Sequence, residues 1–149
     1  METSDISFCN RTALNITSEN TKSFILNELD KYDINITKKN AFILNEKTIN
    51  NISKNDHYIS TRTKGNTYLL FLTKINNINY CLFIDRKINE GYNFPRILTT
   101  KFRFDEILFN GTVFDGELIK KTDEWQFIID DIMVYDNKKI CTNLTERVK

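Results

Sequence analysis

The feature that most constrains the fold is a long apolar stretch in the last third of the chain, broken once by a short polar tip. Two strand-like runs, Thr112–Ile119 and Trp125–Tyr135, flank the polar residues Lys120–Glu124. Two β-rich runs joined by a short polar loop are typical of a β-hairpin. The first run contains Asp115-Gly116-Glu117, and a carboxylate buried in a strand is costly unless it meets a cation, a metal ion or several donors. Outward-facing surface charges and a functional site are both open interpretations of this segment.

Length and composition indicate one folded domain over residues 1–149, since 40% of the chain is hydrophobic and 12% aromatic. The net charge of +1 excludes a global electrostatic attraction for DNA or a membrane, so any anion site must be local. The three cysteines are odd in number and lack metal-ligand spacing. The sequence shows neither a signal peptide nor an apolar run of membrane-spanning length. We therefore expect an intracellular, cytoplasmic protein that contacts neither membrane nor DNA.

The N-terminal part, Met1–Asp56, is predicted to hold one main helix and a lead-in to a sheet. Ser18 is the predicted N-cap of that helix, which should end near Asp30–Asp33. Apolar residues at helical spacing follow the cap: Phe24, Ile25, Leu26, Leu29 and Tyr32. The polar segment Met1–Thr12 predicts a frayed end or a short edge segment.

The remaining segments predict a sheet over His57–Lys149. Its strands are expected at Tyr58–Thr61, Tyr68–Lys74, Asn79–Asp85 and the two runs of the hairpin. Turns are expected at Lys64-Gly65-Asn66 and Asn76-Asn77. Less regular segments are interpreted as a short strand (Ile34–Thr37), a loop with one helical turn (Asn40–Asp56), a loop (Gly91–Lys101) and a strand or helix (Phe102–Leu108). The predicted fold class is α+β, an antiparallel sheet with one main N-terminal helix.

Four short motifs in chain order carry a family resemblance. They are Y-I-S-T-R-T-K-G-N-T-Y (Tyr58–Tyr68), Y-C-L-F-I-D-R-K (Tyr80–Lys87), T-V-F-D-G-E-L (Thr112–Leu118) and F-I-I-D-D-I-M-V-Y-D-N-K (Phe127–Lys138). Their order and spacing resemble the guanylyltransferase domain of mRNA capping enzymes of the large-DNA-virus type. The resemblance implies a nucleotidyltransferase-like (capping enzyme/ligase) fold, of which residues 1–149 would form a single truncated domain, the N-terminal half.

Departures from the family pattern fall on the residues that carry its chemistry. In the family, a lysine attacks the α-phosphate of GTP and carries GMP as a phosphoramidate. Arg62 aligns with that lysine, Lys64 with an aspartate, Thr67 with an arginine, and Asp130 with a base-stacking aromatic residue. Arginine stays protonated at neutral pH and so cannot be the nucleophile. In lacking the lysine the chain is similar to the cap-binding domain of snurportin.

The motifs nevertheless indicate a site for an anionic ligand. The candidate nucleotide-binding residues are Arg62, Lys64, Gly65, Arg86 and Glu117. The resemblance implies that Glu117 faces ribose or a metal ion, with Asp115 and Asp131 as further metal ligands, and that Mg²⁺ or Mn²⁺ would accompany GTP. In the competing interpretation Arg62 and Lys64 are solvated strand ends, and Asp115 and Glu117 are their salt-bridge partners.

Three functions remain open. The first is a catalytically degenerate guanylyltransferase-like module that binds a guanine nucleotide, a capped RNA 5′ end or a capping-complex partner. The second is an active subunit or fragment of a capping enzyme, completed by another chain, with Lys64 as a displaced nucleophile. The third is a purely structural subunit. An open apolar sheet edge is expected at Thr112–Tyr135 or Tyr58–Lys74, so we expect a homodimer or another capping-complex subunit as partner, in the cytoplasm or a viral factory if the source is viral.

Overall fold

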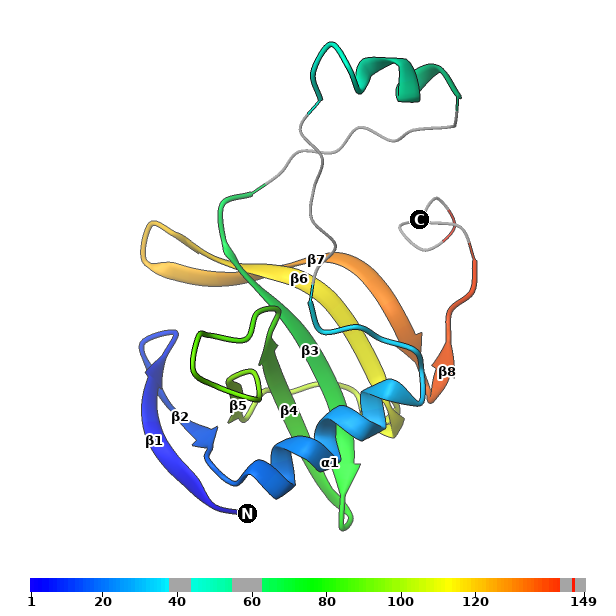
Figure 1. Cartoon of the computed structure of the whole chain (residues 1–149). Coiled ribbons are helices and arrows are strands. Elements are labelled where there is room, and N and C mark those ends of the chain that lie inside the picture. The colour runs from blue at the N-terminus through cyan, green and yellow to red at the C-terminus, as the bar shows by residue number, and fades with distance from the viewer. Residues whose placement is uncertain (38–43, 55–62, 143–145, 147–149) are drawn as a thin grey trace.

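A computed structural model describes residues 1–37, 44–54, 63–142 and 146 (Figure 1). Its elements are β1 (Thr3–Phe8), β2 (Arg11–Ile16), α1 (Glu19–Asp30), the 3₁₀ helix η1 (Ile49–Lys54), β3 (Asn66–Ile75), β4 (Ile78–Asp85), β5 (Ile97–Thr100), the 3₁₀ helix η2 (Glu106–Asn110), β6 (Thr112–Lys121), β7 (Glu124–Tyr135) and β8 (Lys138–Lys139). The predicted strand Tyr58–Thr61 and the candidate residue Arg62 lie outside the described residues.

The strands form one eight-stranded sheet in the order β1-β2-β5-β4-β3-β6-β7-β8. Every neighbouring pair is antiparallel. The helix α1 lies across one face of this sheet (Figure 1). The predicted α+β class, an antiparallel sheet with one main N-terminal helix, is confirmed.

The helix α1 begins and ends where the sequence predicts. The Ser18 hydroxyl oxygen accepts a hydrogen bond from the backbone N–H of Thr21 at 3.3 Å, which satisfies one of the free amides of the first turn. Ile25 and Leu29 of the predicted apolar stripe are buried against the sheet, whereas Phe24 is exposed. Within the described ranges, no helix is long and apolar enough to span a membrane.

Each face of the sheet carries its own hydrophobic core. The helix-side core consists of Ile16, Ile25, Leu29, Ile34, Leu69, Phe71, Leu82, Ile84, Ile97, Val113 and Val134. The core on the other face, which we call the aromatic face, consists of Phe8, Ala13, Tyr68, Leu70, Leu72, Cys81, Phe83, Leu98, Phe109, Phe114 and Leu118. Successive side chains of a strand point to opposite faces, so β3, β4 and β6, each of which has consecutive buried apolar residues, supply both cores.

Both predicted hairpins are present. The turn between β3 and β4 has left-handed backbone angles at Asn76 (φ 52°) and Asn77 (φ 62°), which asparagine tolerates. The hairpin of β6 and β7 turns at Thr122-Asp123, and its strands extend into the predicted polar tip. The helical turn predicted within Asn40–Asp56 is η1.

Several short elements differ from the sequence prediction. Of the two alternatives for Met1–Thr12, the frayed end is wrong and the edge segment is confirmed, because it supplies the edge strand β1 and the start of β2, which turn at Cys9-Asn10. The predicted strand Ile34–Thr37 is absent, because Ile34 is buried in the helix-side core and the Asn35 side chain accepts the Thr37 N–H at 3.0 Å. The predicted loop Gly91–Lys101 contains the short strand β5. The segment Phe102–Leu108, predicted as strand or helix, is irregular except where η2 begins at Glu106. Four- and five-residue elements are too short for a periodic sequence signal.

Candidate functional site

The D-G-E motif lies in the middle of β6 and sends both carboxylates toward the helix side of the sheet. Asp115 is directly opposite Leu69 of β3, and Glu117 is opposite Thr67. Cross-strand partners share a face, and Leu69 belongs to the helix-side core. The interpretation of these carboxylates as outward-facing surface charges is therefore wrong for Glu117, which is only 4% exposed, and for the largely buried Asp115.

Glu117 connects the D-G-E strand to the segment that precedes β3. One of its carboxylate oxygens accepts hydrogen bonds from the Thr63 hydroxyl at 2.5 Å and from the Gly65 backbone N–H at 3.3 Å. Hydrogen bonds to an ionised carboxylate are about twice as strong as neutral ones. The structure thus brings together two predicted residues, Gly65 and Glu117, with Thr63, which the sequence did not single out.

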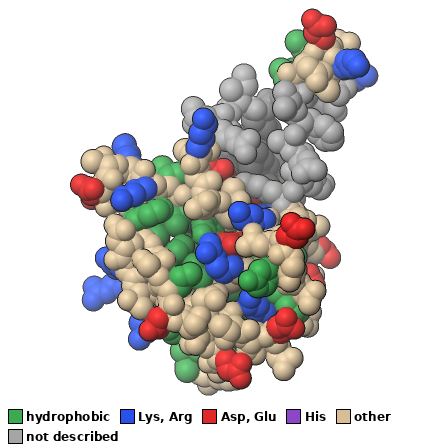
Figure 2. Space-filling model, turned by 60° about the vertical axis from the view of Figure 1, so that its left-hand side comes forward, with side chains coloured by type: hydrophobic (Ala, Val, Ile, Leu, Met, Phe, Trp, Pro, Cys, Tyr) green, Lys and Arg blue, Asp and Glu red, His purple; other side chains and the backbone are tan. Residues whose placement is uncertain are grey.

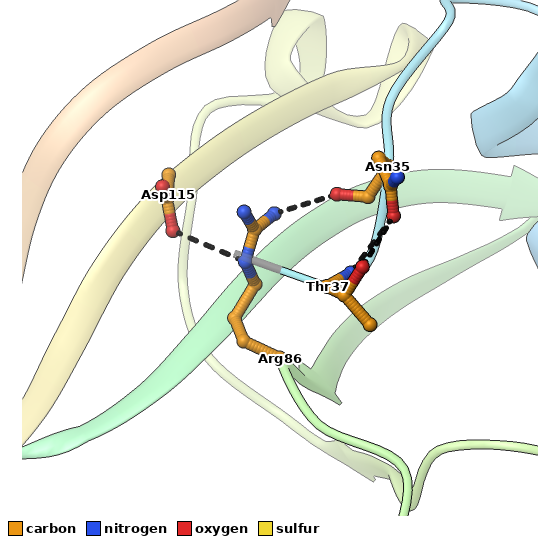
Figure 3. A network of polar contacts seen from close by, with 4 residues as sticks. All are labelled: Asn35, Thr37, Arg86 and Asp115. Atoms are coloured by element: carbon orange, nitrogen blue, oxygen red, sulfur yellow. Dashed lines mark hydrogen bonds and ion pairs between the residues drawn. The ribbon is translucent and has the colours of Figure 1, made fainter. Parts of the chain in front are cut away.

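Arg86, the residue after β4, is buried beside Asp115 (Figure 3). Its Nε lies 3.8 Å from Asp115 Oδ1, and its Nη1 donates a hydrogen bond to the backbone oxygen of Asn35 at 3.1 Å. Burial lowers the pKa of the Arg86 guanidinium from its ordinary value, and the charge of Asp115 acts in the opposite direction. Two strands and the segment after α1 therefore meet at one buried cation.

The two motif glycines are required by close packing rather than by a turn. A Cβ on Gly65 would lie 2.6 Å from the backbone oxygen of Leu118, and a Cβ on Gly116 would lie 2.2 Å from that of Ile128. Gly65 does not have a positive φ, and residues 63–65 form no turn. The predicted turn at Lys64-Gly65-Asn66 is thus corrected to an extended lead into β3, with Lys64 exposed to solvent.

The fourth motif contains a β-bulge at its two adjacent carboxylates, Asp130 and Asp131. Asp115 is opposite Asp131, whereas Gly116 is opposite Ile129, so Asp130 is an extra residue of β7. Bulges often lie next to functional sites, where they redirect side chains. In the described part of the chain, no three His, Cys, Asp or Glu side chains lie together so that they could hold a metal ion. The metal role of Asp115, Glu117 and Asp131 has no geometric support there and stays a prediction.

A cavity of about 230 Å³ lies next to Gly65, at the end of β3 and β4. Its charged lining residues are Asp85, Lys87 and Arg96. Arg96 Nε is 3.2 Å from the buried Asp85 carboxylate, and Arg96 Nη2 donates to the Tyr68 hydroxyl at 3.3 Å. Burial and the charge of Asp85 raise the pKa of Tyr68, with Arg96 opposing them. Sequence inspection missed Arg96, because it stands in an unremarkable loop before a four-residue strand.

Fold and site together define the class: the described residues form an antiparallel sheet with one α-helix, and the buried Glu117 of β6 contacts the segment that leads into β3. The chain belongs to the family of mRNA capping enzyme catalytic domains, since the model of that family matches residues 18–149. A search of curated protein sequences finds no significant match. The family match begins at the N-cap of α1, so β1 and β2 precede the matched residues.

Proposed function

We propose that this chain is a catalytically degenerate mRNA guanylyltransferase-like module that binds a guanine nucleotide or a capped RNA 5′ end in the cytoplasm. The observation that carries the proposal is the buried Glu117, which accepts hydrogen bonds from Thr63 and Gly65. This arrangement supports an assembled site, because the D-G-E strand and the segment that leads into β3 are held together. The resemblance aligns Arg62 with the family's nucleophilic lysine.

The substitution at that position supports binding without group transfer. The family reaction needs a free amine that forms a bond to the α-phosphate, and the Arg62 guanidinium does not lose its proton at neutral pH. Lys64 stands two residues further on, about 6–7 Å along an extended backbone. An error of an ångström in the position of a reacting group costs on the order of 10²-fold in rate. Lys64 is therefore a poor substitute for the nucleophile.

The charges beside Gly65 are suited to an anionic ligand. Lys87 and Arg96 line the cavity there, and only Arg96 has a carboxylate partner, Asp85, among the described residues. Arg86 is committed to Asp115 and Asn35, so we assign it the role of holding the strands together. Since Mg²⁺ and Mn²⁺ are usually held by one or two carboxylates together with substrate phosphates, either ion would enter bound to the phosphates of GTP.

The chemical half of the proposal is tested by incubation with GTP labelled at its α-phosphate, in the presence of Mg²⁺ or Mn²⁺, followed by a denaturing gel. We expect an unlabelled protein band. A labelled band that is lost in Lys64→Ala would identify Lys64 as a displaced nucleophile, and would replace the degenerate module by an active enzyme.

The binding half is tested by calorimetry with GTP and with a cap analogue. Arg62→Ala should weaken binding by about 1.5–3 kcal/mol, as expected for a lost hydrogen bond to a charged group, and Lys64→Ala should weaken it less. Lys138→Ala, which removes an exposed lysine of β8, is the matched control and should bind like the wild type. Equal affinity of the wild type and Arg62→Ala would show that Arg62 does not contact the ligand. Absence of binding at millimolar ligand would favour a purely structural subunit.

An open sheet edge supports a second candidate, a homodimer or another capping-complex subunit that completes the domain. The strand β7 pairs with β6 on one side, and on the other side only Val134 and Tyr135 pair with β8 among the described residues. Ile129 in the unpaired part is half exposed. Unpaired strand edges favour pairing with another chain. The other predicted edge is corrected, because β3 lies between β4 and β6. Light scattering that shows a monomer at every concentration would count against the homodimer.

A further inference from the structure

Two adjoining hollows lie on the aromatic face, on the side of the sheet opposite α1. One, of about 580 Å³, lies between the β6–β7 tip and the β1–β2 turn, and the other, of about 980 Å³, extends beside η2. Both are lined by Arg11, Thr100, Phe102 and Phe104, so they form one continuous surface, which we call the aromatic groove. Figure 2 views the molecule from the side of the first hollow and shows apolar side chains below a protruding tip that carries charged residues.

Aromatic rings form a connected series along this groove. Phe102 lies between Phe83 and Phe104, with ring centroids 5.9 and 6.3 Å apart, and Phe104 contacts Phe109 at 6.3 Å. Phe83 and Phe109 are buried, whereas Phe102 and Phe104 are 40% and 37% exposed. Half-exposed rings that are held in place by a buried aromatic core offer flat surfaces on which nucleobases stack.

Cations alternate with these rings in the sequence Lys101-Phe102-Arg103-Phe104. Arg11, Lys101 and Arg103 line the hollow beside η2, and no acidic side chain lines it. None of these three cations forms an ion pair with a residue in the described part of the chain. The hollow beside η2 therefore combines a positive rim with an aromatic floor, which is complementary to a polyanion that carries planar bases, whereas Asp123 and Glu124 line the hollow at the β6–β7 tip.

The single tryptophan of the chain marks the other end of the groove. Trp125 lines the hollow at the β6–β7 tip, and its Nε1 is buried without a hydrogen-bond partner among the described residues. Lys120 lies 6.0 Å from the centre of its ring. Because Trp125 lines this end of the groove, its fluorescence reports on binding there.

We propose that the aromatic groove binds single-stranded RNA without sequence preference. Phe102 and Phe104 stack on successive bases, while Lys101, Arg103 and Arg11 contact phosphates. The groove is separate from Glu117 and Arg86, which face the helix side of the sheet, and its β1–β2 wall precedes the residues that match the family. It would hold the strand of an RNA independently of whether a guanine or a cap is recognised.

The test uses the full chain and a fluorescent, uncapped oligouridylate ten nucleotides long, so that neither guanine nor a cap contributes. We expect saturable binding in the micromolar range, together with a change in the fluorescence of Trp125. Phe102→Ala/Phe104→Ala should weaken binding by about tenfold or more, because each ring provides a surface on which one base stacks. Arg103→Gln and Lys101→Gln should each reduce the slope of log K against log salt by about 0.7.

The matched control is Phe24→Ala/Lys138→Gln, which removes one exposed ring from α1 and one exposed cation from β8. It should bind the oligonucleotide like the wild type. The two charge variants change exposed side chains, so they test the groove even if the double phenylalanine variant fails to fold. Equal losses in control and groove variants, or no binding of the wild type, would overturn the proposal.

Three further outcomes separate this proposal from the alternatives. Loss of oligouridylate binding in the groove variants with unchanged GTP binding supports the groove and leaves the nucleotide site standing. A wild type that binds GTP but not the oligonucleotide refutes the groove alone. A concentration-dependent dimer that dissociates in Phe102→Ala/Phe104→Ala, with no binding of RNA, would assign the groove to a second copy of the chain and overturn the RNA proposal.

Discussion

The two faces of the sheet place their charges in opposite ways. On the helix side, Arg86, Asp115 and Glu117 enter the interior, where Arg86 and Glu117 contact groups from other strands or from the segment after α1. Along the aromatic groove the interior is hydrocarbon, and the cations Lys101 and Arg103 stay on the rim. Buried charges must be paired because they lose their hydration, whereas rim charges are free to meet a ligand. The charges of the helix side thus hold segments together around the D-G-E motif, whereas the cations of the aromatic groove remain exposed.

The largest expected effect on stability comes from a comparison of a buried ring with a partly exposed ring on the aromatic face. Phe83 is buried and contacts the rings of Phe8, Tyr68 and Phe127 as well as Phe102. Phe83→Ala should therefore lower the free energy of unfolding by about 4 kcal/mol through the cavity that it leaves. Phe104→Ala should cost far less, about 1 kcal/mol, since the removed ring is partly exposed already. Urea denaturation measures both, and similar losses would mean that Phe104 belongs to the core rather than to a binding surface.

Removal of one charge on the helix side is the next largest change. Asp115→Ala leaves the Arg86 guanidinium buried without its carboxylate and should lower the free energy of unfolding by about 3 kcal/mol. Lys74→Ala, which breaks the exposed ion pair with Glu106, is the control and should cost about 0.5 kcal/mol or less. Thermal and chemical denaturation of the two variants provide the comparison. If Asp115→Ala lowers the free energy of unfolding as little as the control does, the buried Arg86 guanidinium does not need the Asp115 carboxylate. The contrast between paired charges on the helix side and exposed charges along the groove would then fail.

The glycine of the D-G-E motif tests how closely β6 and β7 approach. A methyl group at Gly116 would meet the backbone oxygen of Ile128 and the ring of Phe127. We expect Gly116→Ala to lower the free energy of unfolding by about 2 kcal/mol through overpacking. Gly91→Ala is a poor control because Gly91 has a φ of 83°, so Ser53→Ala in η1 serves instead and should be neutral. An unchanged midpoint for Gly116→Ala would show that the hairpin relaxes at its bulges.

The smallest expected effect concerns the loss of stability at alkaline pH. Burial raises the pKa of Cys81 and of Tyr68 above their ordinary values, and both lie in the core of the aromatic face. These groups ionise first in the unfolded chain, so stability is complete below their ordinary pKa values and falls as the pH rises above about 9. Urea midpoints at pH 7.5 and pH 10 measure the fall. Cys81→Ala/Tyr68→Phe should make the decrease in the urea midpoint between the two pH values smaller. An equally large decrease in this variant would show that other groups cause the loss of stability at alkaline pH.

Local chemistry made part of the structure predictable. The Ser18 cap and the apolar residues after it specify α1, and asparagines that accept a positive φ specify the β3–β4 turn. The polar tip between two β-rich runs specifies the β6–β7 hairpin. In each case the interaction that decides the conformation spans only a few residues. The order of the four motifs was likewise enough to predict the capping-enzyme family, which the family match confirms.

Contacts between segments far apart in the chain decided the rest. Nothing near Thr63 indicates that its hydroxyl meets Glu117, and nothing near Arg96 indicates its contacts with Asp85 and Tyr68. The extra residue Asp130 in β7 follows from how two strands fit against each other, and β5 exists because β4 and β2 pair with it on either side. The aromatic groove depends most on tertiary structure, because it joins side chains of the first hairpin, the Lys101–Phe104 segment and the β6–β7 tip, and the free energy of such contacts depends on positions in space that no local sequence pattern encodes.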